Sequence, residues 1–242
     1  SQNWEELNQK AIDAMMAGNM DEALRMSGEA ADAARASGNP EQLLTALSNR
    51  SEIQQSIGDF ENAEVTAREA ITLSREIYGE SAETADLTGS LAVMYAYMGR
   101  HEDAEREYKE ELKIREGLPG DWQGMVQSLQ GLAESVMNQG RHSESVELLE
   151  RAASLIREHA GADSQELGPV LVNESVVYSA MNDPEKAGQI LREALRIYEK
   201  DPGPGHPVFA DTLSRLAATH AARGAAPPAQ TLCPQARDVL KT

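Results

Sequence analysis

Two histidines occupy matching places in the sequence, and their spacing is the nearest that the chain comes to a chemical site. His101 and His142 each follow a Gly-Arg pair. Two equivalent imidazoles could bind a metal ion or respond to pH. No further ligand shares their spacing, and a zinc site needs three or four, so packing is the expected role of both. His159, His206 and His220 stand alone, and we expect the same of them.

None of the common catalytic motifs occurs in the 242 residues. The phosphate-binding pattern G-x-x-x-x-G-K-[ST], the nucleophile pattern G-x-S-x-G and the metalloprotease pattern H-E-x-x-H are all missing, and no G-x-G-x-x-G follows a strand. The single cysteine, Cys233, excludes an intramolecular disulfide and a cysteine-based zinc site. We therefore predict a protein that is not an enzyme and that has no cofactor and no metal.

The charge is strongly negative: 40 acidic and 22 basic residues give a net charge of −18. Nucleic acids and anionic membranes need dense Lys and Arg, so both are unexpected partners. Residues 1–121 carry 25 acidic and 11 basic residues, so a basic partner would be steered towards this half. The alternative is a solvated acidic surface that keeps the protein soluble. No apolar stretch could span a bilayer and no signal peptide is visible, so we expect a cytoplasmic location.

One turn recurs along the whole sequence. Its central residues are 40 to 42 positions apart, and they are Gly18, Gly58, Gly99, Gly140, Asn182 and Gly224. After glycine, asparagine best tolerates the left-handed conformation that ends many helices. Small and large residues alternate at spacings of three and four on both sides of the turn, which is typical of two antiparallel helices.

The period predicts an all-α solenoid in which each helix-turn-helix unit stacks on its neighbours. Linkers rich in Gly, Pro and acidic residues separate the units, and no segment shows the alternation of a strand. We predict one domain over residues 1–242. Its six repeats cover about 1–38, 39–79, 80–120, 121–161, 162–203 and 204–242.

These residues resemble the tetratricopeptide repeat (TPR) family, and in particular its subtype of about 42 residues found in kinesin light chains. The best stretch, Arg75–Glu116, carries the subtype's pattern as Leu91, Ala92, Tyr95, Gly99, Ala104, Glu105 and Tyr108. The resemblance implies a right-handed α-solenoid that acts as an interaction scaffold with many different partners.

The sequence departs from the subtype in its first two repeats and in its last. Lys10 and Arg50 stand where the subtype favours leucine. Pro227, Pro228 and Pro234 fall in what would be the last helix. We expect that helix to be short or frayed, because an interior proline removes a backbone donor.

In this family the first helix of each pair lines a concave groove. The mapped faces contain carboxylates but no Lys or Arg, so a carboxylate clamp, which needs basic residues, is not expected. The groove should instead hold a basic or amphipathic peptide or helix of a partner protein. Its methionines either contact the ligand or are partly buried between helices. The predicted groove residues are Glu5, Asn8, Ile12, Met15, Glu52, Gln55, Asp86, Val93, Tyr97, Gln130, Glu134, Met137 and Asn138.

Two other functions remain open at this point. The chain could self-associate as a structural module, and the alanine-rich stretch Ala217–Ala229 is the candidate surface for a homo-oligomer. Alternatively, it could be a regulatory segment of a larger signalling protein.

Overall fold

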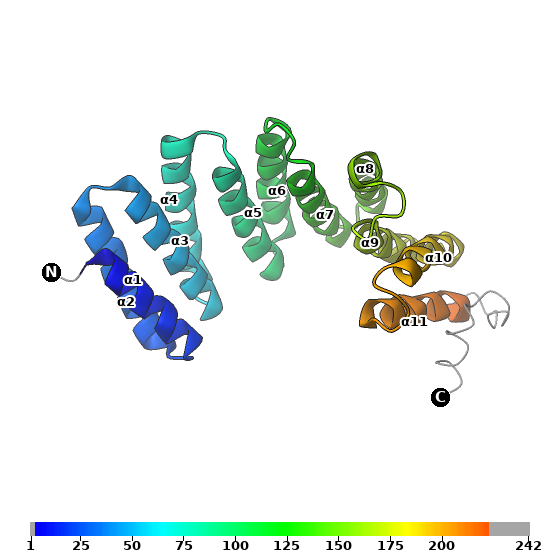
Figure 1. Ribbon diagram of the computed structural model, residues 1–242, viewed down its shortest axis with the longest axis horizontal. Coiled ribbons are helices and arrows are strands. Elements are labelled where there is room, and N and C mark those ends of the chain that lie inside the picture. The colour runs from blue at the N-terminus through cyan, green and yellow to red at the C-terminus, as the bar shows by residue number, and fades with distance from the viewer. Residues whose placement is uncertain (1–2, 223–242) are drawn as a thin grey trace. The chain divides into compact units, whose positions relative to one another are not determined.

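The computed structural model describes residues 3–222, and within them it contains only α-helices and no strand (Figure 1). The predicted all-α solenoid fold is thus confirmed. The chain divides into two compact units, Ser1–Pro119 and Gly120–Thr242. The predictions for Cys233, for the prolines near the end and for most of the Ala217–Ala229 stretch lie outside the described residues. The single domain predicted over 1–242 stays a prediction.

The first unit consists of three helix pairs. The first helix of each pair packs on the second, α2 packs on α3, α4 packs on α5, and α1 also contacts α3. The helices are α1 (Trp4–Met16), α2 (Met20–Ser37), α3 (Pro40–Ser56), α4 (Phe60–Tyr78), α5 (Ala82–Tyr97) and α6 (His101–Glu116).

The second unit repeats this plan with two pairs and one further helix. Here α8 packs on α9, α10 packs on α11, and α7 also contacts α9. Between residues 3 and 222, no helix has the length and apolar character needed to cross a membrane. The helices are α7 (Trp122–Asn138), α8 (His142–Ala160), α9 (Leu167–Ala180), α10 (Pro184–Lys200) and α11 (Pro207–Ala222).

The recurring turn residues end the first helix of each pair, as their spacing predicts. Gly18, Gly58, Gly99 and Gly140 all have a positive φ, and Asn182 has φ 61°. The next backbone N–H then reaches back to a carbonyl five residues earlier, as Asp183 N does to Tyr178 O at 2.9 Å. Asn182 is the only non-glycine residue with a positive φ between residues 3 and 222. Gly224, the last turn residue, lies outside this part.

Small buried residues hold the two helices of each pair close together. Ala23, Ala63, Ala104 and Ala187 follow the turn by five residues, and all are fully buried. In the fourth repeat a serine stands at this place. Its hydroxyl, on Ser145, donates a hydrogen bond of 2.8 Å to the carbonyl of Ala133 on the facing helix. The small side chains therefore allow the two antiparallel helices, which the spacing of small and large residues predicts, to approach closely.

Glycines inside three helices leave room for a large side chain from a neighbouring helix. A Cβ at Gly28 would lie 2.6 Å from Nη1 of Arg50, and one at Gly89 would lie 2.7 Å from the carboxylate of Glu111. A Cβ at Gly168 would overlap the ring of Tyr198. The glycine in α2 thus explains how Arg50 is accommodated at a position where the subtype favours leucine.

Replacing Gly168 with alanine is expected to destabilise the chain by about 1 kcal/mol. The added methyl group would overlap the buried Tyr198 ring, and overpacking of this kind costs roughly 1–3 kcal/mol. The better helix propensity of alanine offsets about 1 kcal/mol of this cost. The measurement is the urea midpoint of Gly168→Ala against that of Gly168→Ala with Tyr198→Leu. If the ring is the cause, the double variant recovers stability relative to the single one, and no recovery would contradict the steric explanation.

Candidate functional site

Three open pockets occupy equivalent places in the repeats. Each is bounded by the first helix of one repeat, the second helix of that repeat and the first helix of the next. We name them the α3–α5, α7–α9 and α9–α11 pockets. The first lies in the Ser1–Pro119 unit and the other two lie in the Gly120–Thr242 unit.

The α3–α5 pocket brings together three of the predicted groove residues, Glu52, Gln55 and Val93. Its volume is about 390 Å³. Glu52 is exposed, and it makes no ion pair or hydrogen bond within residues 3–222. Val93 supplies an exposed apolar wall from α5. The full lining is Ser48, Asn49, Ser51, Glu52, Gln55, Ala67, Ala70, Leu87, Ser90, Leu91 and Val93.

The α7–α9 pocket has the same character in the second unit. It holds the predicted residues Gln130, Glu134 and Met137 in a volume of about 190 Å³. Glu134 stands at the repeat position of Glu52, six residues before the turn. It too is exposed and has no partner in the described part of the chain. The full lining is Gln130, Ala133, Glu134, Met137, Ser145, Leu149, Asn173, Val176 and Val177.

A side-chain amide pair links neighbouring first helices in each unit. Asn49 Nδ2 donates to Asn8 Oδ1 at 3.0 Å, and Asn173 Nδ2 donates to Gln130 Oε1 at 3.3 Å. Asn8 and Gln130 belong to the predicted groove, whereas both donors stand nine residues before a turn and are not in the predicted set. An amide has two donors and two acceptor lone pairs, so each pair keeps hydrogen-bonding capacity for a ligand.

Asp86, a predicted groove residue, already has a basic partner. Arg115 Nη2 of α6 donates to Asp86 Oδ1 at 2.6 Å, and Arg115 Nε donates to Glu111 Oε1 at 2.9 Å. The side chains of Arg115 and Glu111 are each only 6% exposed. The prediction mapped first helices alone, and this arginine reaches Asp86 from a second helix. Asp86 is therefore less able than Glu52 to attract a basic ligand.

The other predicted residues of α1 line none of the three pockets. Glu5 is exposed beside the N-cap residue Asn3, whose Nδ2 lies 3.5 Å from Glu5 Oε2. Ile12 and Met15 are half-buried, and Met15 packs against the core cluster that contains Leu7. Met137 is also half-buried, so both predicted methionines combine partial burial with some exposure.

Two further predicted residues are exposed near helix ends and line none of these pockets. Tyr97 is 81% exposed at the end of α5, and its ring centroid lies 5.8 Å from that of Phe60. Asn138 is the exposed last residue of α7. The two side chains thus add an aromatic surface and a polar surface outside the pockets.

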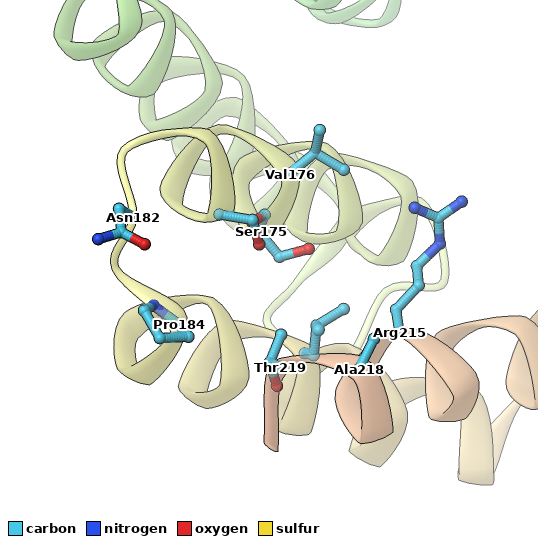
Figure 2. A pocket seen from close by; sticks show the side chains of 9 residues that line it. Ser175, Val176, Asn182, Pro184, Arg215, Ala218 and Thr219 are labelled. Atoms are coloured by element: carbon cyan, nitrogen blue, oxygen red, sulfur yellow. The ribbon is translucent and has the colours of Figure 1, made fainter. Parts of the chain in front are cut away.

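The α9–α11 pocket contains a basic residue that the sequence analysis missed. Its volume is about 330 Å³, and Arg215 of α11 forms one end of it (Figure 2). Arg215 stands nine residues before the turn, at the repeat position of Asn49 and Asn173. The groove mapping omitted this position in every repeat. The full lining is Ser175, Val176, Ser179, Asn182, Pro184, Leu191, Arg215, Ala218 and Thr219.

Glu174 and Glu64, which line none of the three pockets, have pKa values shifted in opposite directions. Burial raises the pKa of Glu174 to about 7, and the nearby charge of Glu150 adds to the rise. The opposite holds for Glu64, where a 2.6 Å hydrogen bond from the Tyr95 hydroxyl and an ion pair with Arg100 hold the pKa below its usual range. Each shift makes the free energy of unfolding depend on pH, because the pKa differs between the folded and the unfolded chain.

The histidines take up packing or surface positions. His159 stacks on Trp122 with ring centroids 5.2 Å apart, and His101 and His142 are half-buried at the start of α6 and α8. In residues 3–222 no three His, Cys, Asp or Glu side chains gather into a possible metal site.

Several known proteins are similar to this chain in sequence or in structure. Kinesin light chain-related 1 of Arabidopsis thaliana is 29% identical over 151 residues, which are 60% of this chain and 24% of that protein. The structure of BtubC (BKLC) from P. vanneervenii superimposes with a TM-score of 0.73 at 22% identity, covering 92% of this chain and 91% of that one. A STAND protein from Pyrococcus horikoshii, described as a signal transduction ATPase with a tetratricopeptide repeat sensor, gives a TM-score of 0.74 at 18% identity. The match covers 92% of this chain and 34% of the STAND protein.

Two family models match the chain itself. The model of the MalT-like TPR region matches residues 10–165, more than half of the sequence, and a tetratricopeptide repeat model matches residues 169–201. The chain therefore belongs to the MalT-like TPR family, whose helical repeats form a non-catalytic scaffold for protein interactions.

Proposed function

We propose that this scaffold binds a basic or amphipathic peptide segment of a partner protein in its repeat pockets. The observation that carries the proposal is the pair of equivalent glutamates, Glu52 and Glu134. Each lies exposed in a pocket and has no basic partner in the described residues. A ligand with Lys or Arg at matching places would supply that partner.

The neighbouring groups suit a peptide. Amide side chains such as Asn49 and Gln130 can exchange hydrogen bonds with a peptide backbone, because one amide offers both donors and acceptors. Val93 and Met137 offer apolar contact beside the acids, and methionine adapts its shape to different partners. The role of the thirteen predicted residues in binding is part of this proposal.

The test is a double charge reversal, Glu52→Lys with Glu134→Lys. Random displayed 12-residue peptides are selected on the wild-type chain, and the affinity of the enriched peptides is measured by calorimetry at low and moderate salt. We expect enrichment of Lys or Arg next to apolar residues. The double variant should bind such a peptide about tenfold or more weakly at low salt, since it loses two favourable charge contacts and gains two repulsive ones.

The matched control is Glu61→Lys with Glu147→Lys, which makes the same charge change at exposed residues of second helices. This control should keep most of the affinity. If both double variants weaken binding equally, the effect comes from the net charge of the protein and not from the pocket glutamates. Enriched peptides that lack basic residues would contradict the proposal itself. Asp86 is left unchanged, because its substitution would disturb Arg115 as well.

A second candidate function is suggested by the STAND protein, in which a similar segment is described as a sensor within a longer chain. In that case the peptide bound by the repeats would act as a signal for the rest of the protein. The present residues also correspond to about a quarter of the kinesin light chain-related protein that they match. Peptide binding that changes the activity of the parent protein would favour this function over a passive scaffold.

A further inference from the structure

The α9–α11 pocket differs in charge from the two pockets that occupy equivalent places. Six residues before the turn, the α3–α5 and α7–α9 pockets have Glu52 and Glu134, whereas this pocket has Val176. The opposite wall of each pocket is the first helix of the next repeat. Nine residues before the turn, this helix has Ser90 in the α3–α5 pocket, Asn173 in the α7–α9 pocket and Arg215 in the α9–α11 pocket. An acid is thus absent from one wall and a guanidinium is present on the other. We propose that the α9–α11 pocket binds a peptide segment through a carboxylate that Arg215 holds.

Part of the Arg215 guanidinium is available to donate hydrogen bonds to a ligand. Its Nε donates to Asp211 Oδ2 at 2.8 Å, one turn earlier on α11. Within residues 3–222 its two terminal nitrogens make no hydrogen bond, and the side chain is 46% exposed. Asp211 thus binds the Nε side of the guanidinium, and the N–H groups of Nη1 and Nη2 at its end are available to a ligand. Two parallel N–H groups at this end match the two oxygens of a carboxylate.

The rest of the lining supplies acceptors and apolar contact. The hydroxyls of Ser175, Ser179 and Thr219 donate to the carbonyls of Val172, Ser175 and Leu216 at 2.6, 2.8 and 2.7 Å, respectively. Because each hydroxyl has one hydrogen, these oxygens can only accept from a ligand. A peptide presents N–H donors of this kind along its backbone.

The two ends of the pocket differ in chemistry. Figure 2 shows Asn182 and Pro184 at one end and Arg215 at the other, with Ser175 and Val176 on α9 and with Thr219 and Ala218 on α11. A short extended segment can place its carboxylate at the arginine and a backbone amide group near Asn182. Its small apolar side chains would then lie against Val176, Leu191 and Ala218.

This site goes beyond the proposed function, because its ligand carries the opposite charge and it uses none of the thirteen predicted groove residues. It can exist whether or not the acidic pockets bind a basic segment. A carboxylate can come from a chain terminus or from an Asp or Glu side chain, and the two sources share the chemistry that Arg215 recognises.

Three synthetic hexapeptides of one uncharged parent sequence test the site. The first is acetylated and has a free C-terminal carboxylate, the second has an internal Glu and an amidated terminus, and the third has Gln in place of that Glu. Each is titrated into the ¹⁵N-labelled full chain, and chemical shifts are followed at the Arg215 Nε–H group and at the Ser179 and Thr219 amides. We expect saturable shifts with at least one carboxylate peptide and none with the Gln peptide. The peptide that binds identifies the source.

Two arginine variants make the test specific. Arg215→Gln should weaken the binding of the carboxylate peptide about 10- to 100-fold, since it removes a charge-assisted hydrogen-bonding pair. Arg215→Lys keeps the positive charge but loses the planar guanidinium with its paired N–H donors. Its affinity for the carboxylate peptide should lie between those of Arg215→Gln and the wild type. The control Arg157→Gln makes the same charge change at an arginine of α8 that pairs with Glu193 and does not line the pocket, and it should bind normally.

Several results would overturn the inference. One is equal binding of the Gln peptide and the carboxylate peptides, and another is unchanged affinity of Arg215→Gln. Absence of shifts with all three peptides at millimolar concentration is a third. The far-ultraviolet circular dichroism of each variant must match that of the wild type, so that lost binding is not mistaken for lost folding.

Discussion

Replacing Arg115 with methionine is expected to lower the free energy of unfolding by about 3–5 kcal/mol. This is the usual cost of removing one partner of a buried ion pair while the other partner stays charged. Arg115 and Glu111 are almost fully buried, so their interaction is little screened by solvent. The substitution leaves the Glu111 carboxylate in the interior without its guanidinium. It also removes the 2.6 Å ion pair that Arg115 makes with Asp86.

Urea unfolding at pH 7, followed by helical circular dichroism, measures this effect. Arg115→Met should give a clearly lower midpoint than Lys109→Met, a control on the same helix whose side chain is 53% exposed and pairs with Glu105. The double variant Glu111→Gln with Arg115→Met should recover much of the loss, because the buried charge is then gone as well. A midpoint for Arg115→Met that stays at the wild-type value would show that the pair contributes little.

The second large effect concerns Glu174, whose replacement by glutamine is expected to stabilise the chain above pH 7. Glu174 is only 7% exposed, and its pKa is raised from 4.5 to about 7 by burial and by the charge of Glu150. The folded state therefore disfavours the charged form of this carboxyl group. A shift of this size corresponds to about 3 kcal/mol, at roughly 1.4 kcal/mol for each pKa unit.

The sign of the pH dependence follows from that shift. Below about pH 4.5 the carboxyl group is protonated in the folded and the unfolded chain, and it imposes no penalty on folding. Between about pH 4.5 and 7 the unfolded chain releases the proton first, so stability falls as the pH rises. Above about pH 7 the full penalty is present and stays constant.

Unfolding of Glu174→Gln at pH 8 and at pH 4.5 checks this behaviour. We expect a gain of about 2–3 kcal/mol at pH 8 and almost none at pH 4.5. Glu158→Gln, at an exposed residue of α8, should change little at either pH. A gain from Glu174→Gln that is the same at both pH values would attribute the effect to packing rather than to ionisation.

The helix pairs could be predicted from the sequence because the signals that specify them are local. A turn residue that needs a positive φ restricts its position to glycine or asparagine, so the period is visible even where Asn182 replaces glycine. The small residues beside the turn are visible for the same reason, since any larger side chain would separate the paired helices. The first and second helices of each pair follow directly from these two patterns.

The contents of the pockets were less predictable, because they depend on side chains that reach across from another helix. Arg215 and Asn173 stand at a position that a first-helix mapping assigns to the helix flank, yet both line a pocket formed with the preceding repeat. Arg115 reaches Asp86 from α6, and nothing in the local sequence around Asp86 indicates this. Comparing the residue nine positions before each turn could have revealed Arg215 as the basic member of that set.

The glycines inside α2, α5 and α9 limit how far these repeats can be exchanged as building blocks. Gly168 stands fourteen residues before its turn, and the residues at the same place in the earlier repeats are Trp4, Leu44, Ala85 and Val126. A chimaera that transplanted any of those first helices opposite α10 would set a larger side chain against the ring of Tyr198. Protein engineers who shorten, extend or shuffle this array should therefore move each such glycine together with its bulky counterpart.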